Sequence, residues 1–365
     1  MFLTAANLAH YLTARGFVSS SDVVDGQFSV IEAGQHNRNF KVLSGARGGI
    51  FVKQIQAIDS LAQSSLLKEA QCYRWAQNFP EWAASIPVLL DYDPARHCII
   101  FELLRDSQNL REYYYQQNIF PTSLANLLAD ALSRYHRLSF DVKELDVAIP
   151  DLQKKVPWIF TYYKKSYFPP KSLSAGALQF AEYLRSKPTL TAHLDRLFQT
   201  WRFETLIHAD LKWDNCLLYH NADQPKLKII DWELVEFGDR RWDVGSVFQA
   251  YLSHWVMRHY RDKSQGREQL LQHTVDSMPA MFASINTFWR AYCDGMQLAV
   301  QDRPLHLLQC LEFSAIRMLR TAFESLYGAA EVSQHAQALV ELSQQILDAP
   351  AQVAVNLFGF AEESL

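Results

Sequence analysis

The chain has 365 residues, of which 49% are hydrophobic, and it carries a formal net charge of −4. This length suits two lobes better than one small domain, and the apolar content is enough for a sizeable core. Lysine and arginine are dispersed rather than gathered in a basic block, which argues against nucleic acid as the main partner.

The cysteines and the N-terminal segment favour a cytosolic protein. The five cysteines are odd in number and lack metal-type spacing, which favours reduced thiols. The N-terminal segment MFLTAANLAHYLTARGF has the pattern of an amphipathic helix and lacks a basic segment followed by an apolar block, so we expect no signal peptide. No run approaches the roughly 18–20 apolar residues that span a membrane, so we expect a cytoplasmic protein without a membrane partner.

The first strands are predicted on either side of a turn. Residues 27–31 alternate as a strand does, and the alternation resumes at residues 40–42. Gly34 lies between them at a tight turn, whose backbone N–H groups can face phosphate oxygens. A turn favours glycine in any case, so a phosphate-binding role and a purely structural role both stay open for Gly34.

The next strand and helix contain a lysine and a glutamate that are candidate partners. Residues 50–55 form a predicted strand in which Lys53 lies between apolar neighbours, where a charged group needs a partner. Residues 64–78 have helical spacing, and Glu69 is the natural acidic partner for Lys53. Alternatively, Lys53 lies on a strand edge and Glu69 on a solvated helix face.

The middle of the chain changes from strand to helix. Residues 97–104 indicate a buried strand that runs into a connector, and residues 107–117 and 124–138 have helical spacing. His136, near the end of the second helix, is expected to be structural rather than catalytic. Residues 143–175 are the least patterned, and their aromatic side chains indicate either an insertion packed on the core or a ligand site.

A segment in the second half of the chain combines short apolar runs with a polar loop. Two apolar runs, 216–219 and 226–230, flank a stretch rich in turn-forming residues, which predicts a hairpin. The outer ends of a hairpin lie side by side, so we expect Asn215 and Asp231 to come together. Asp210 lies a few residues earlier in the same polar loop.

These three side chains fit one kind of chemistry. Mg²⁺ prefers a few carboxylate or amide oxygens together with substrate phosphates, which suits Asn215 and Asp231. A nearby aspartate such as Asp210 can orient a hydroxyl group and accept its proton as the phosphoryl group leaves ATP. Alternatively, these polar residues are ordinary surface turn residues, and His208 is a buried, hydrogen-bonded histidine.

The patterns of this segment resemble those of the aminoglycoside phosphotransferase and choline kinase superfamily, relatives of the protein kinases. They are H-A-D-L-K-x-x-N from His208, I-I-D-W-E around Asp231 and G-D-x-x-W-D ending at Asp243. Protein kinases have H-R-D-L-x-x-x-N and D-F-G instead. Ala209 and the Trp-Glu pair after Asp231 therefore indicate the small-molecule branch, whereas Lys212 corresponds to a protein-kinase lysine that contacts the transferred phosphate.

The resemblance implies an α+β, two-lobed protein-kinase-like fold. A small antiparallel-sheet N-lobe would cover residues 1–102, and a mostly helical C-lobe would cover residues 103–365. ATP and Mg²⁺ would be the cofactors and would lie between the lobes. The enzyme would be an ATP-dependent phosphotransferase with an alcohol group as the acceptor.

The family's nucleotide-binding residues carry over onto the first part of this chain. Lys53, held by Glu69, would orient the α- and β-phosphates beneath a covering loop with the pattern G-x-x-N-R-N-F-x-V. Adenine would bond to the backbone carbonyl of Glu102 and the backbone N–H of Leu104. The expected nucleotide-binding residues are Gly34, Asn37, Lys53, Glu69, Glu102 and Leu104.

The family's catalytic residues carry over onto the polar loop and the hairpin. Asp210 would receive the acceptor proton, and Lys212 would neutralise charge on the moving phosphoryl group. Asn215 and Asp231 would hold Mg²⁺. Asp243 corresponds to a buried carboxylate that holds the catalytic loop by hydrogen bonds.

The acceptor is left open between three alternatives. The first is a hydroxyl of a small molecule, such as an amino sugar, a choline-like alcohol or a metabolite. The second is a Ser or Thr hydroxyl on a peptide, for example a lanthipeptide-type precursor, which only Lys212 and the aromatic stretch 158–168 favour. The third is a pseudokinase that binds nucleotide without transfer, which the presence of Lys53, Asp210 and both expected metal ligands disfavours.

The C-terminal part of the chain is expected to be helical. Arg317, Arg320 and Glu324 share one side of a predicted helix, where they either form surface salt bridges or face the acceptor. The predicted helices lie within residues 178–196 and at 247–260, 278–298, 305–326 and 334–347.

Overall fold

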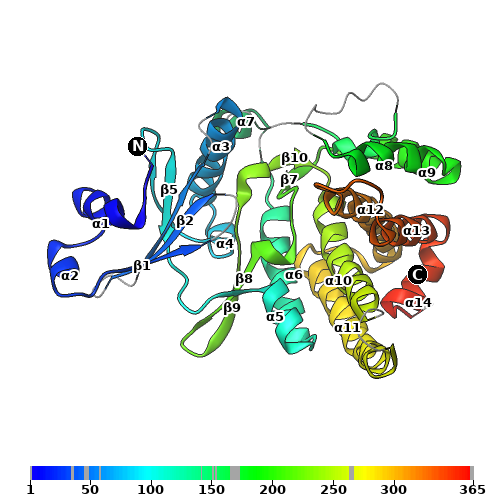
Figure 1. The fold of residues 1–365 in the computed structure, drawn as a ribbon. Coiled ribbons are helices and arrows are strands. Elements are labelled where there is room, and N and C mark those ends of the chain that lie inside the picture. The colour runs from blue at the N-terminus through cyan, green and yellow to red at the C-terminus, as the bar shows by residue number, and fades with distance from the viewer. Residues whose placement is uncertain are drawn as a thin grey trace. The chain divides into compact units, whose positions relative to one another are not determined.

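The protein is described by a computed structural model in which two compact units are distinguished. The structure describes residues 2–33, 37–44, 49–56, 59–140, 142–149, 152, 154–164, 173–262 and 267–361 (Figure 1). Unit 1 contains Met1–Leu110, Phe140–Leu152 and Asn215–Val235, and unit 2 contains Arg111–Ser139, Gln153–Asp214 and Glu236–Leu365. Each unit is therefore assembled from segments that are distant in the sequence.

Unit 1 is built on a five-stranded antiparallel sheet with the strand order β1-β2-β3-β5-β4. The strands are β1 (Ser29–Ala33), β2 (Arg38–Leu43), β3 (Ile50–Gln54), β4 (Leu89–Asp93) and β5 (Cys98–Glu102). Phe40, Val52 and Ile100 lie opposite one another in the register, so their side chains share one face of the sheet, where they are buried. Leu8 and Leu12 of α1 (Ala5–Ala14) belong to the same apolar cluster.

The helix α3 (Ser60–Ala76) places Glu69 in the interior of unit 1. It begins after Asp59, whose side chain accepts a hydrogen bond from the Ala62 N–H at 2.8 Å, as expected for an N-cap. Its buried face carries Glu69 and Tyr73, and the helix packs against β4, β5 and η3 (Trp232–Leu234). The remaining helices of unit 1 are α2 (Ser20–Val24), α4 (Pro80–Ala83) and α7 (Val142–Ala148).

The predicted hairpin is confirmed and belongs to unit 1. Strands β8 (Cys216–Asn221) and β9 (Gln224–Ile229) pair antiparallel with Cys216 opposite Ile229, and β6 (Gln108–Asn109) pairs with β8. Ala222 and Asp223 connect the strands with φ angles of 48° and 63°. Positive φ at both central residues is characteristic of the tight hairpin turn that matches strand twist.

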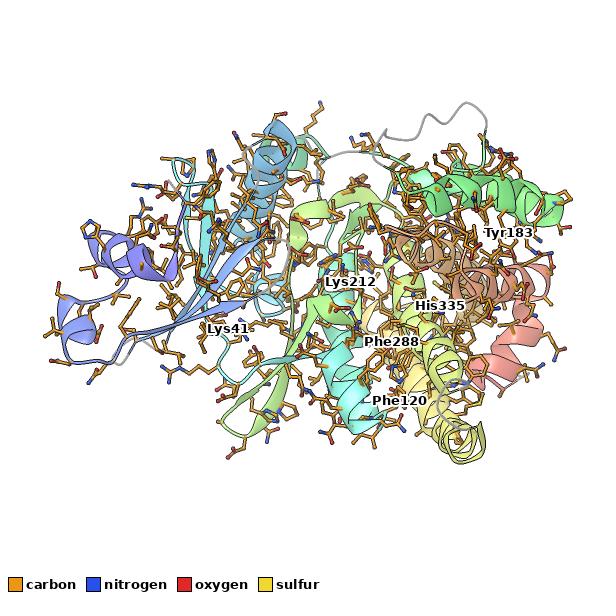
Figure 2. All side chains as sticks on the ribbon, in the orientation of Figure 1. Lys41, Phe120, Tyr183, Lys212, Phe288 and His335 are labelled. Atoms are coloured by element: carbon orange, nitrogen blue, oxygen red, sulfur yellow. The ribbon has the colours of Figure 1, made fainter. Side chains whose placement is uncertain are left out.

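Unit 2 is mostly helical. It also contains a two-stranded sheet of β7 (Thr205–Ile207) and β10 (Glu236–Gly238) and the short helices η1 (Trp158–Phe160), η2 (Trp213–Asn215) and η4 (Val300–Asp302). The side chain of Phe288 on α11 (Arg267–Gly295), labelled in Figure 2, is fully buried among these helices. The helices are α5 (Leu110–Gln117), α6 (Thr122–His136), α8 (Ala175–Arg185), α9 (Pro188–Gln199), α10 (Arg240–Asp262), α11 (Arg267–Gly295), α12 (Arg303–Glu324), α13 (Gln334–Asp348) and α14 (Pro350–Phe358).

Close packing between α10 and α12 fixes the position of α12. A Cβ atom at Gly245 of α10 would lie 2.8 Å from Ser314 N and 2.9 Å from Phe313 C on α12, so only glycine allows this approach. Arg317 follows Ser314 by about one helical turn, which spans about 3.6 residues. The contact at Gly245 therefore also sets the place of Arg317.

Several sequence-based boundaries differ from the structure. α10 begins at Arg240 rather than at residue 247, because Arg241 and Asp239 form a buried ion pair at its start, with 2.8 Å between Arg241 Nε and Asp239 Oδ1. α11 also begins earlier than expected. The segment 107–117, predicted as a helix, begins with the strand β6, and the helix α14 is not predicted by the sequence. Polar residues in the first turns of α10 and α11, beginning with Arg240 and Arg267, hide these starts from a search for apolar periodicity.

The aromatic stretch packs on the core of unit 2 in its described part. The rings of Phe160 and Trp242 are 6.0 Å apart, and the Tyr162 hydroxyl donates a hydrogen bond to Ala177 O at 2.6 Å. This agrees with a packed insertion rather than a ligand site, and Tyr167 and Phe168 lie outside the described residues. All five cysteines are buried thiols. Within the described ranges, no helix is both long and apolar enough to cross a membrane.

Candidate active site

Lys53 of β3 lies at the centre of a charged group in unit 1. Its register places it opposite Asn39 and Ile99, on the face of the sheet that is opposite to Val52. Lys53 Nζ lies 2.8 Å from Glu69 Oε2 on α3, which is the expected pairing. Lys53 is 6% exposed, so the ion pair is shielded from solvent.

Two further carboxylates contact the same ammonium group. Lys53 Nζ lies 2.5 Å from Asp231 Oδ1 and 3.5 Å from Glu233 Oε2. Glu69, Asp231 and Glu233 each have a carboxylate oxygen within 4.8 Å of the others, a spacing compatible with a shared metal ion. Carboxylate oxygens gathered in this way are the kind of ligand that a divalent cation such as Mg²⁺ prefers.

The pKa values in this group reflect burial and the excess of carboxylates. Burial raises the pKa of Glu69 to about 7, because the attraction of Lys53 is opposed by the neighbouring Asp231 and Glu233. Burial acts to lower the pKa of Lys53, but the three carboxylates outweigh it and raise the pKa above its usual range. Lys53 therefore stays charged, and Glu69 takes up a proton near neutral pH.

The backbone at Asp231 positions its side chain. Asp231 has φ 68° and ψ 53°, in the left-handed region that few residues other than glycine adopt. Directly after it, the Trp232 indole N–H donates a hydrogen bond to Ile229 O at 3.1 Å, and the ring packs against Trp82 at 5.4 Å. Such backbone conformations persist where the surrounding structure enforces them, often at functional sites.

Asn215 lies at the same end of the hairpin as Asp231. The Ile230 N–H donates a hydrogen bond to Asn215 O at 2.9 Å, which extends the β8–β9 ladder by one pair. Asn215 is 5% exposed. The structure thus brings the two expected metal ligands to neighbouring positions, as the hairpin pattern predicts.

The structure gives fewer contacts for the other expected nucleotide-binding residues. Glu102 ends β5, and its side-chain Oε1 lies 2.5 Å from Lys228 Nζ and accepts from the Val88 N–H at 3.0 Å. Leu104 follows the strand, and within the described part of the chain its backbone N–H has no hydrogen-bond partner. Asn37 is partly buried just before β2, and Gly34 lies outside the described residues.

Asp210 is the centre of a second charged group, which lies entirely within unit 2. Asp210 Oδ2 lies 2.8 Å from Lys212 Nζ, and Oδ1 lies 2.9 Å from Arg320 Nη2 and 3.8 Å from Arg317 Nη2. Burial acts to raise the pKa of Asp210, but the three cations outweigh it and lower the pKa. Asp210 is therefore ionised, as a proton acceptor must be.

Asp243 holds the loop that carries Asp210, as the sequence predicts. Its carboxylate accepts hydrogen bonds from the His208 N–H at 2.7 Å, the Ala209 N–H at 3.1 Å and the Tyr135 hydroxyl at 2.8 Å. His136 is buried and lies 2.9 Å from the Tyr292 hydroxyl and 3.4 Å from Asp243, which agrees with a structural role. Asp243 is fully buried, so these bonds are not shared with solvent.

We expect Asp243→Ala to destabilise unit 2. The substitution removes a buried acceptor from two backbone N–H groups and a tyrosine hydroxyl, and breaking a buried charged network of this kind costs about 3–5 kcal/mol. Urea unfolding monitored by fluorescence would measure the change. As a control, Asp294→Ala removes an exposed pair with Arg303 and should change the free energy of unfolding by less than about 1 kcal/mol. Equal effects of both substitutions would contradict the role of Asp243.

Three contacts were not predicted from the sequence. Glu233 follows Asp231 in the I-I-D-W-E pattern, but nothing in that pattern says that its side chain turns back toward Lys53. The sequence leaves Arg317 and Arg320 open between surface salt bridges and a place facing the acceptor. A surface pair does form between Arg320 Nε and Glu324 at 2.8 Å, but Arg317 is buried. The apolar neighbours of Arg317 in the sequence were the signal of its burial.

Comparisons with known proteins identify the family of this chain. The sequence model of the phosphotransferase enzyme family, abbreviated APH, matches residues 27–273, which is more than half of the chain. The protein is a phosphotransferase, and its chain belongs to this family. No curated protein sequence matches the chain significantly.

Solved structures of low sequence identity share the fold. An ethanolamine kinase from Plasmodium vivax is 13% identical with a TM-score of 0.57, and the alignment covers 91% of this chain and 86% of that one. The GDP complex of aminoglycoside 2'-phosphotransferase-IIIa is 16% identical with a TM-score of 0.52, over 95% and 98% of the two chains. The macrolide 2'-phosphotransferase MphH from Brachybacterium faecium is 13% identical with a TM-score of 0.50, over 91% and 96%. The predicted kinase-like fold is therefore confirmed.

Proposed function

We propose that the protein transfers the γ-phosphate of ATP, bound with Mg²⁺, to a hydroxyl group of a small molecule. The observation that carries this proposal is the contact of buried Lys53 with three carboxylates beside the hairpin end that bears Asn215. An ammonium group fixed in this way is suited to phosphate oxygens, and the oxygen donors around it are of the kind that Mg²⁺ prefers.

The donor set fits Mg²⁺ on its chemistry. The group contains the carboxylate oxygens of Glu69, Asp231 and Glu233, and oxygen donors of this kind suit Mg²⁺ better than a softer transition metal. We assign Asn215 and Asp231 as the ligands, and Glu233 as a further acidic group close to them. When bound, Mg²⁺ supplies positive charge that offsets the charge of the phosphates.

The residues of the chain have separate tasks in the proposed reaction. Lys53, fixed by Glu69, orients the phosphates, while Leu104 and Glu102 offer backbone groups to the adenine. Asp210 accepts the proton of the acceptor hydroxyl through a carboxylate oxygen, and Lys212 balances charge on the transferred phosphoryl group. Gly34 and Asn37 belong to the covering loop in this proposal. The domain division at residue 102 is likewise proposed on the resemblance alone.

A small-molecule acceptor is favoured over a peptide. The structures that share the fold include proteins named for ethanolamine, aminoglycoside and macrolide acceptors. The aromatic stretch that favoured a peptide packs on the core in its described part, as shown by the contact of Phe160 with Trp242.

The test is the release of ADP from ATP, with and without Mg²⁺. We expect wild-type protein to release ADP in the presence of Mg²⁺ and a suitable alcohol, and Asp231→Asn to lose both the activity and its dependence on Mg²⁺ because a carboxylate ligand is removed. The acceptor panel should contain small alcohols, amino sugars and Ser/Thr peptides. Activity with peptides alone would replace the small-molecule proposal, and ATP binding without any transfer would support the pseudokinase alternative.

A further inference from the structure

Glu102, the last residue of β5, uses its side chain where a regular strand pair would use the backbone. The Glu102 N–H donates a hydrogen bond to Val88 O at 3.0 Å. Two residues that are paired in this way in an antiparallel sheet normally exchange both of their backbone hydrogen bonds. Here the Val88 N–H donates instead to Glu102 Oε1, also at 3.0 Å. The Glu102 carboxylate therefore takes the place of its own backbone carbonyl in this pair.

This arrangement leaves the backbone carbonyl of Glu102 available to a ligand, as far as the described residues show. The next residue, Leu103, is held on the side of β3, because its N–H donates to Gly49 O at 3.2 Å. Successive residues of a strand direct their backbone groups to alternate sides. The Glu102 carbonyl therefore faces away from β3, on the side where Val88 lies.

Lys228 of β9 holds the Glu102 carboxylate in this place. Lys228 Nζ lies 2.5 Å from the same oxygen atom, Glu102 Oε1, and Lys228 is 8% exposed. The strand that carries Lys228 is itself anchored, because the Ile229 N–H donates to Ser85 O at 2.8 Å. A buried ammonium group needs an anionic partner, and a charge-assisted hydrogen bond is stronger than a neutral one. Lys228 therefore fixes the position of the carboxylate oxygen that the Val88 N–H contacts.

We propose that Lys228 is a positioning residue for adenine recognition. It keeps the Glu102 carboxylate on the Val88 N–H, so that the Glu102 backbone carbonyl can accept a hydrogen bond from the amino group of adenine. This inference rests on the proposed function and adds a residue that acts through Glu102 without touching the nucleotide. All four groups, including Val88, belong to unit 1.

The consequence of losing Lys228 follows from the same geometry. The side chain of Glu102 is 33% exposed, so its carboxylate turns to solvent when the ammonium group is removed. The Val88 N–H then pairs with the Glu102 carbonyl, as in a regular antiparallel ladder. This bond draws the carbonyl toward Val88 and away from the amino group of adenine.

The first experiment compares two nucleotides that differ only in the amino group of the base. Titration calorimetry in the presence of Mg²⁺ measures the Kd of ADP and of purine riboside 5′-diphosphate, which lacks this amino group, and it needs no phosphate acceptor. We expect wild-type protein to bind ADP about tenfold more tightly, as for one well-placed hydrogen bond. In Lys228→Met this preference should fall to about twofold or less through weaker binding of ADP, with little change for the other nucleotide.

Two further variants separate positioning from a general loss of structure. Lys228→Arg keeps a cation beside Glu102 and should keep most of the preference for ADP. Lys226→Met is the matched control, because Lys226 is exposed on the same strand opposite Tyr219 and should leave both Kd values unchanged. A purely structural role of Lys228 would weaken the binding of both nucleotides equally, which would overturn the proposal.

Glu102→Ala tests the contact from its other side. The substitution keeps the backbone carbonyl and removes the carboxylate, so it should lower the preference for ADP as Lys228→Met does. The double variant should show the same preference as either single variant, because both substitutions act through one contact. Glu102→Ala keeps the test valid if Lys228→Met does not fold.

The titrations also separate this proposal from the proposed function. If ADP does not bind to the wild-type protein, the proposed function fails, and the role of Lys228 fails with it. If ADP binds but wild-type protein shows no preference for it over purine riboside diphosphate, only the role of Lys228 fails. A preference that stays at the wild-type value in Lys228→Met or in Glu102→Ala would also overturn that role alone.

Discussion

Lys53→Met is expected to lower the free energy of unfolding by about 3–5 kcal/mol and to abolish most of the phosphotransferase activity. The substitution removes the cation that contacts Glu69, Asp231 and Glu233. Glu69 is 1% exposed, so its charge cannot be compensated by water. Losing one fixed charge at the phosphates should reduce kcat by about 10²–10³-fold.

The loss of stability in Lys53→Met should depend on pH in a defined direction. Burial already raises the pKa of Glu69 to about 7, and removing Lys53 raises it further. Over the range between the unfolded and the folded pKa, the folded state binds more protons, so stability falls as pH rises. The double variant Lys53→Met/Glu69→Gln should therefore be more stable than Lys53→Met at pH 8 and should show little of this pH dependence.

Urea unfolding at pH 6 and pH 8 would measure these effects, with Lys41→Met as the matched control. Lys41 lies on the neighbouring strand β2 opposite Phe51, on the same face of the sheet, and is partly buried (Figure 2). Its substitution should change the free energy of unfolding by less than about 1 kcal/mol and leave ADP release unchanged. A stability of Lys53→Met that does not change between the two pH values would contradict the charge argument.

Much of unit 1 could be predicted because its signals are local in the sequence. The alternation in β3 places the side chains of Lys53 and Val52 on opposite faces of the sheet. Two apolar runs with turn residues between them define the β8–β9 hairpin. A hairpin fixes its own register, so the proximity of Asn215 and Asp231 follows from a short stretch of sequence. The pairing of Lys53 with Glu69 could be predicted because it involves only one strand and the helix that follows it.

The contacts of Arg317 and Arg320 with Asp210 could not be predicted in the same way. Arg317 and Arg320 follow Asp210 by more than 100 residues, and their approach depends on how α12 packs against α10 at Gly245. Helical periodicity shows that Arg317 and Arg320 share a side of α12, but it does not say what that side faces. The position of the Glu233 side chain could not be predicted either, although Glu233 is close to Asp231 in the sequence. It depends on the turn that follows the left-handed backbone conformation of Asp231.

Asp210→Asn is expected to reduce kcat by about 10²–10⁴-fold, the range for loss of a general base, without weakening the binding of Mg·ATP. The amide keeps the size of the side chain but cannot accept the acceptor proton. The matched control is Asp214→Asn in the same loop, which removes an exposed pair with Arg111 at 3.0 Å and should leave kcat within about twofold. Equal activity of Asp210→Asn and wild type would exclude Asp210 as the base.

The pH dependence of the wild-type reaction provides a second test of Asp210. Arg317, Arg320 and Lys212 outweigh burial and hold the pKa of Asp210 below its ordinary value, so the carboxylate stays ionised as the pH falls. The acid limb of kcat/KM should therefore lie below the usual range for an aspartate, about pH 3.9. Arg320→Gln removes one cation at 2.9 Å from Asp210, which should raise this pKa and shift the acid limb to higher pH. A limb that stays in place in Arg320→Gln, while Asp210→Asn is inactive, would show that a group other than Asp210 controls the acid limb. A shift of the acid limb toward higher pH would show that Arg320 lowers the pKa of Asp210. A purely structural role of Arg320 would change the rate without moving the limb.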